Sequence, residues 1–128
     1  MNRTDDVQRF LPLAPHAFQI LLSLLDEVRH PYSILKDVEE RTEGEMVLGT
    51  STVYSAIKRM LLDGLLREAE EPTDEASGGP RRRYYGITPL GREVARAEGH
   101  RIARLHRMVR ESALLAEGRG ASPRRAES

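Results

Sequence analysis

The sequence contains no cysteine and no tryptophan, and only 5% of its 128 residues are aromatic. Without cysteine the chain cannot form a disulfide framework, a thiolate nucleophile or a zinc site built on sulfur. Long apolar runs are also missing, because Ser23 interrupts the segment from Ile20 to Leu25, so we expect no membrane-spanning segment. The N-terminus lacks the basic and apolar pattern of an export signal. These absences favour a cytoplasmic protein with no membrane partner.

The residues that catalysis and metal binding need do not form a recognisable group. His100 and His106 are six residues apart, which places them on different faces of a helix and makes them poor co-ligands. The glycines form no phosphate-binding loop of a known kind, and no Ser/His/Asp spacing stands out. We therefore do not expect an enzyme, and we predict no catalytic residue, no metal site and no cofactor.

Charge is balanced over the whole chain but not along it. Lys+Arg and Asp+Glu both number 20. Residues 1–75 carry 8 basic and 15 acidic side chains, whereas residues 76–128 carry 12 basic and 5 acidic ones. Such asymmetry favours a polyanionic partner for the basic part, although solvated helix faces would produce the same count.

Apolar periodicity predicts three helices in the first half of the chain. The first begins at Pro15 and the second at Pro31, because proline suits the first position of a helix. The third follows Thr50–Thr52, which are all capable N-caps, and ends at Asp63-Gly64. Residues 26–30, between the first two helices, are expected to form a turn.

The second half predicts two short strands and a long helix. Strands are expected over residues 65–70 and 83–87, with a loop rich in Pro, Gly, Ser and acidic residues between them. Thr88-Pro89 then marks a helix start, and the helix is expected to continue to about Glu117. Its apolar stripe needs a partner to cover it.

This order of elements predicts a mainly α fold with a small β-hairpin (α+β), a winged helix-turn-helix with a long C-terminal dimerisation helix. We expect a flexible N-terminal arm over residues 1–10 and a DNA-binding domain over residues 11–88. The dimerisation helix is expected over residues 89–117, and a disordered tail over residues 118–128.

The outward face of the third helix has the side chains of a DNA-contacting surface. If Val53, Ile57 and Met60 point inward, the opposite side presents hydroxyls, a tyrosine and two cations, with no carboxylate before Asp63. The residues on that side and at its margins are Ser51, Thr52, Tyr54, Ser55, Lys58 and Arg59. For Ser51 alone, capping of the helix is a sufficient explanation.

Three consecutive arginines, Arg81–Arg83, form the densest local charge. Adjacent guanidinium groups suit phosphates, but they could also pair with Glu68, Glu70 and Glu71 on the opposite strand. We expect one arginine to stabilise the hairpin and at least one to contact DNA.

Three segments of the chain resemble PadR-type transcriptional regulators. They are LPLAPHAFQILLSLLDEVRHPYSILKDVEERT, LGTSTVYSAIKRMLLDGLL and RRRYYGITPLGREV, and together with the long last helix they cover most of the chain. The resemblance implies a homodimer that binds a palindromic operator in double-stranded DNA and represses genes, with its last helix paired across the dimer with the first helix. Some such proteins are released by a small molecule, so an effector of unknown identity belongs to the expectation. Binding of a flat aromatic ligand between tryptophans is excluded here.

The resemblance also assigns residues. It places Thr52, Tyr54, Lys58 and Arg59 in the recognition-helix motif, Tyr32 in the second helix, and Arg82 to Tyr85 in the wing motif. The predicted DNA-contacting residues are Tyr32, Thr50, Ser51, Thr52, Tyr54, Ser55, Lys58, Arg59, Arg81, Arg82 and Arg83. The predicted dimer interface is Phe18, Leu22, Val94, Ile102, Leu105 and Val109.

A second interpretation stays open. The overall neutral charge is unusual for a DNA-binding domain and would suit a winged-helix module that binds another protein. The acidic residues, however, concentrate over residues 37–45 and 68–75, away from the expected DNA face.

Overall fold

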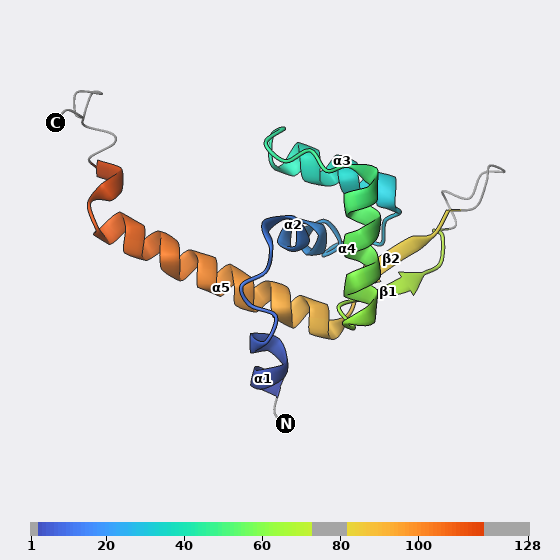
Figure 1. Cartoon of the computed structure of the whole chain (residues 1–128), viewed down its shortest axis with the longest axis horizontal. Helices are drawn as coiled ribbons and strands as arrows, with labels where there is room; N and C mark the ends of the chain where they lie inside the picture. Colours follow the sequence, from blue (N-terminus) through green and yellow to red (C-terminus); the bar gives the residue numbers. More distant parts are fainter. Residues whose placement is uncertain (1–2, 73–81, 117–128) are drawn as a thin grey trace.

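The structure, a computed structural model, describes residues 3–72 and 82–116. Its helices and strands follow one another around a small helical body from which the last helix projects (Figure 1). In chain order they are α1 (Arg3–Gln8), α2 (Pro15–Ser23), α3 (Pro31–Arg41), α4 (Thr50–Leu62), β1 (Leu66–Ala69), β2 (Tyr84–Ile87) and α5 (Pro89–Glu111). The mainly helical fold with a β-hairpin, predicted as a winged helix-turn-helix, is confirmed.

Helices α2, α3 and α4 form the body, and each contributes one apolar stripe to a shared core. The expected starts of α2 and α3 at proline are correct. The imidazole of His30 caps α3, because its Nδ1 accepts a hydrogen bond of 3.2 Å from the Ser33 N–H. The buried side chains of the three helices that build this core are Ile20, Leu21, Ile34, Val38, Val53, Ile57 and Met60.

The wing is a two-stranded antiparallel hairpin that is attached to the helical body. Leu66 lies opposite Ile87, and Ala69 lies opposite Tyr84. The backbone of Arg29 forms a bridge to the other edge of β2, with hydrogen bonds of 3.1 and 2.9 Å to Tyr85. The segment expected to be a simple turn therefore also ties the wing to the start of α3.

Two local expectations about the first half of the chain are wrong. Residues 3–8 form the short helix α1 rather than a flexible arm, and Val7 is buried in the core. Helix α1 packs on α5, so its apolar partner lies about ninety residues away along the chain. The N-cap of α4 is Gly49, not one of the three hydroxyl residues that follow it.

Helix α5 begins as expected and ends earlier than expected. Thr88 caps it by accepting a hydrogen bond of 3.0 Å from the Gly91 N–H. At its other end the Ser112 hydroxyl donates to the Val109 carbonyl at 2.6 Å, and Ala113 adopts a positive φ of 68°. A side chain that binds a backbone carbonyl favours a turn over a further helical turn. The helix thus stops at Glu111, and its 23 residues span roughly 35 Å.

A buried charge anchors the middle of α5. Glu98 is 2% exposed, and its carboxylate accepts hydrogen bonds of 2.8 and 2.7 Å from Arg101. These bonds hold the pKa of Glu98 below its ordinary value, and the backbone of Leu13 lowers that pKa further, against the opposing effect of burial. The pair joins α5 to the segment that precedes α2. No helix in the described part of the chain is long and apolar enough to cross a bilayer.

Candidate nucleic-acid interface

Helix α4 presents its predicted DNA-contacting residues to solvent. Val53, Ile57 and Met60 are buried beneath it, which turns the opposite side outward. The exposed residues on that side and its margins are Thr50, Ser51, Thr52, Tyr54, Ser55, Lys58 and Arg59. They are hydroxyls, a phenol and two cations, so the face is rich in hydrogen-bond donors and carries net positive charge.

The hydroxyls at the start of α4 are not occupied in capping it. The cap position belongs to Gly49, and no side-chain hydrogen bond closes this end of the helix. Capping therefore does not explain Ser51, contrary to the simpler sequence-based explanation. Hydroxyls at an outward-facing helix N-terminus, where the helix dipole is positive, are well placed to bind an anion.

The two cations of α4 differ in their surroundings. Arg59 lies 3.3 Å from the Asp63 carboxylate, one helical turn away, and its side chain is still largely exposed. An exposed ion pair of this kind contributes little free energy, so Arg59 remains able to bind another anion. Lys58 is exposed on the outward face.

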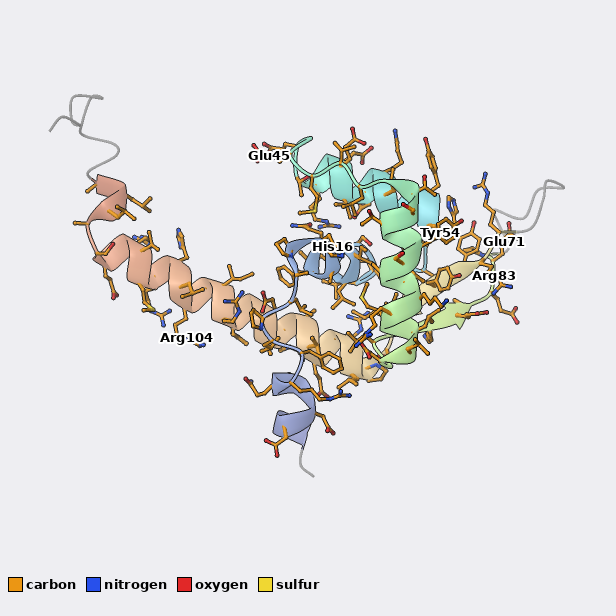
Figure 2. The ribbon with its side chains drawn as sticks, viewed as in Figure 1. His16, Glu45, Tyr54, Glu71, Arg83 and Arg104 are labelled. Atoms are coloured by element: carbon orange, nitrogen blue, oxygen red, sulfur yellow. The ribbon has the colours of Figure 1, made fainter. Side chains whose placement is uncertain are left out.

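A hollow lies where α3, α4 and the wing meet, and we call it the wing hollow. Its volume is about 440 Å³, and Tyr54 reaches it from α4. Figure 2 shows Tyr54 on the side of α4 that faces the wing, where Arg83 also lies. The residues that line the wing hollow are His30, Pro31, Tyr32, Tyr54, Arg82 and Arg83. The fold therefore brings together four residues that the sequence assigned to DNA contact, from three separate segments.

The wing arginines have different neighbours. Arg83 pairs across the hairpin with Glu68 at 3.3 Å, as expected for one structural arginine. Nη1 of Arg82 instead lies 2.9 Å from Nε2 of His30. Arg81 lies outside the described residues.

His30 is the residue of this region that sequence reasoning did not assign to the site. Its imidazole caps the N-terminus of α3. Its neighbour Arg82 is 52 residues away in the sequence, so no local pattern could have indicated their contact. The ring also packs edge-on against Tyr84, with 5.3 Å between centroids.

A second hollow, of about 490 Å³, lies on the other flank of α4, beside α2. His16 and Ala17 line it from α2, and Ser55 and Arg59 line it from α4. Helix α4 therefore stands between two concave surfaces, which leaves its outward face accessible from both sides.

The residues predicted for a dimer interface differ in their exposure. Val94 is fully buried within its own chain, so its assignment to an interface is wrong. Phe18 and Leu22 are half-buried at the edge of the body. Ile102 and Leu105 are 41% and 45% exposed on the projecting part of α5. The remaining predicted residue, Val109, is half-buried, and the exposed apolar residues near it that the sequence prediction omitted are Met108, Leu114 and Leu115.

Comparison with known proteins agrees with this arrangement. The sequence pattern of the transcriptional regulator PadR-like family matches residues 20–97, from α2 into α5. The chain belongs to the PadR-like family of transcriptional regulators. In the described part of this PadR-like chain, no group of three or more His, Asp or Glu side chains could hold a metal ion.

Solved structures share the PadR-like fold. A PadR family transcription regulator from Clostridium difficile R20291 is 24% identical, with a TM-score of 0.64 over 77% of this chain and 97% of that one. Bacillus subtilis PadR, solved in complex with operator DNA, is 16% identical, with a TM-score of 0.57 over 67% of this chain and 47% of that one.

A relative by sequence is an uncharacterized 37.1 kDa protein in transposon TN4556 of Streptomyces fradiae. It is 33% identical over 112 residues, which are 88% of this chain and 27% of that protein. The chain thus spans about a quarter of the length of this relative.

Proposed function

We propose that this PadR-like regulator binds a palindromic operator in double-stranded DNA as a homodimer and represses transcription. The observation that carries the proposal is the outward face of α4, which is exposed, free of carboxylates and flanked by the wing hollow. In a winged helix-turn-helix such a helix enters the major groove, and its neighbours contact the phosphate backbone. B. subtilis PadR, which shares the fold, has been solved in complex with operator DNA, and this supports DNA as the partner.

The projecting part of α5 supports a dimer. Ile102, Leu105 and Met108 expose apolar surface there. A second copy would cover this stripe, and the half-buried Phe18 and Leu22 lie at the edge of the body where α5 of the partner would pack. A symmetric dimer of winged domains meets half-sites roughly 34 Å apart, which matches a palindrome.

Regulation by a small molecule of unknown identity is the remaining part of this proposal. Operator binding by a dimer depends on the relative orientation of its two α4 helices. A ligand that favours one arrangement of the α5 helices would therefore change affinity by selecting that arrangement.

DNA binding is tested by selecting bound fragments from genomic DNA and measuring affinity over a series of salt concentrations. We expect a steep loss of affinity with salt, because phosphate contacts release counterions. Lys58→Ala should weaken binding and lower the salt slope by about one. Arg104→Ala, which removes the same charge from α5 far from α4 (Figure 2), is the matched control and should leave the slope unchanged. Absence of duplex binding at low salt would overturn the proposal and favour the protein-binding interpretation.

The homodimer is tested by sedimentation over a range of protein concentrations. Leu105→Glu places a charge in the exposed apolar stripe and should shift the protein to monomers without unfolding it. Arg104→Glu, one residue earlier on an exposed face, should leave the dimer intact. A wild-type chain that sediments as a monomer would contradict the dimer.

Repression is tested separately by placing a selected operator upstream of a reporter gene, where the regulator should lower expression.

A further inference from the structure

The hollow between α2 and α4, which we call the α2 hollow, has a lining that suits an anion. Its volume is about 490 Å³, and it lies on the flank of α4 that faces away from the wing hollow. Among the described residues that line it, none carries a carboxylate. The residues that give it polar character are His16, Ser51, Thr52, Ser55 and Arg59. Two cationic or hydrogen-bonding nitrogen groups and three hydroxyls therefore share one concave surface.

His16 contributes to the α2 hollow from the first turn of α2, and its side chain is half-buried. Figure 2 shows His16 and Arg83 on opposite sides of α4. An imidazole donates at least one N–H whether it is neutral or protonated, so His16 can bind an anionic oxygen in either form. It is not among the residues that the sequence predicted to contact DNA.

Arg59 contributes to the same hollow from α4 and keeps the capacity to bind a second anion. Its Nε lies 3.3 Å from the Asp63 carboxylate, but its side chain is still 77% exposed. A guanidinium carries five N–H donors, so it can bind a phosphate while Nε stays beside Asp63. Because an exposed ion pair contributes little free energy, a shift of Arg59 toward a phosphate costs little.

The geometry of a DNA groove explains why this flank of α4 would meet a phosphate. The major groove is about 12 Å wide, and an α-helix with its side chains is about 10–12 Å across. A helix that enters the groove therefore has one sugar-phosphate strand along each flank. The α2 hollow is the concave surface on one flank of α4, and it presents donors to the strand on that side.

We propose that His16 and Arg59 together bind one backbone phosphate of duplex DNA in the α2 hollow. The inference rests on the proposed function, and it adds His16 on α2 as a DNA-contacting residue. It also assigns Arg59 to the phosphate backbone, so Arg59 supplies affinity that does not depend on base sequence. A DNA phosphate is favoured over a free anion because Ser55 and Arg59 belong both to the hollow and to the outward face of α4.

The test measures the affinity of the full chain for a labelled random-sequence duplex by fluorescence anisotropy in a series of KCl concentrations. His16→Ala removes the imidazole and leaves a strong helix former in α2. We expect the affinity to fall about tenfold, as for loss of a hydrogen bond to a charged group, with an unchanged melting temperature. A folded His16→Ala chain that binds duplex as tightly as wild type would overturn the contact.

Arg59→Ala should lower the affinity to a similar extent and reduce the salt slope by about one. The loss should be the same factor for the random duplex and for a fragment selected from genomic DNA, because a phosphate contact carries no base information. A loss confined to the selected fragment would show that Arg59 contacts bases instead. If both residues bind one phosphate, the double variant with His16→Ala should lose little more than either single variant. Losses that multiply independently would contradict a shared phosphate.

His16→Arg tests the contact by a gain of binding if the alanine variant proves unstable. A permanent cation in the α2 hollow should raise the affinity and steepen the salt slope by up to about one. His106→Arg makes the same exchange on the projecting part of α5 and is the matched control, which should change neither quantity. Partial unfolding cannot produce such a gain, and wild-type affinity in His16→Arg would then count against the contact.

The experiment separates this inference from the proposed function. If the wild type does not bind duplex at low salt, the proposed function fails, and this contact fails with it. If the wild type binds and Lys58→Ala weakens binding while His16→Ala and Arg59→Ala do not, only the assignment of the α2 hollow is wrong.

Discussion

The two halves of α5 have the same kind of apolar spacing and opposite surroundings. In the inner half, Val94 is fully buried and Ala95 is nearly so, because α1, α2 and β2 pack around them. In the outer half, Ile102, Leu105 and Met108 are 41%, 45% and 56% exposed. Figure 1 shows why: the outer half extends beyond the body. Helical periodicity thus indicates that a surface will be covered, but not whether the same chain or another one covers it.

The largest expected difference between the halves is at their glycines. A Cβ at Gly91 would overlap the backbone carbonyl of Leu65 and approach the Ile87 side chain at 2.8 Å, whereas a Cβ at Gly99 meets nothing within 4 Å. Gly91→Ala should lower the free energy of unfolding by about 3 kcal/mol through overpacking. Gly99→Ala should raise it by up to about 1 kcal/mol through helix propensity. Urea denaturation measures both, and equal effects would contradict the difference in packing.

Truncation of an apolar side chain should likewise lower the free energy of unfolding more in the inner half of α5 than in the outer half. Val94→Ala removes buried methyl groups and should lower the free energy of unfolding by about 2 kcal/mol. Leu105→Ala removes exposed surface, so it should leave the unfolding of the monomer nearly unchanged and raise the dissociation constant of the dimer. Denaturation at low protein concentration, combined with sedimentation, distinguishes the two effects. A Leu105→Ala monomer destabilised as much as Val94→Ala would show that the outer half is part of the folded body.

Glu98 marks the boundary between the halves, and its contribution should depend on pH. Its pKa in the folded chain is below the ordinary carboxyl value of 4.5, so its stabilising effect is present above pH 4.5 and is lost as pH falls through the folded pKa. Glu98→Gln should lower the melting temperature by about 5 °C at neutral pH. The difference in melting temperature between the variant and the wild type should become smaller as pH falls below 4.5. Calorimetry over this pH range measures the two melting temperatures. A difference between them that does not change with pH would contradict the prediction.

The smallest effect is expected at the ion pair of the wing. Arg83 and Glu68 are both largely exposed, so their pairing should contribute under about 0.5 kcal/mol to stability. Glu68→Gln should therefore leave the melting curve almost unchanged. A loss of unfolding free energy comparable to that expected for Val94→Ala would show that the hairpin depends on this ion pair.

Much of the candidate interface could be predicted locally. The outward direction of Lys58 and Ser55 follows from the helical period of Val53 and Ile57, and the structure confirms their exposure. That these residues contact DNA stays a prediction. The convergence of Tyr32, Tyr54 and the wing arginines could not be derived from spacing, because it depends on how three separate segments pack.

The sequence by itself determined where α2, α3 and α4 form and which of their faces are buried, because apolar period and proline or glycine signals act over a few residues. It also determined the carboxylate-free face of α4. Only the tertiary structure decided that residues 3–8 are helical, that Val94 lies inside its own chain and that His30 meets Arg82. Each of these depends on contacts between residues distant along the chain, and a local pattern carries no information about which distant surface will be near.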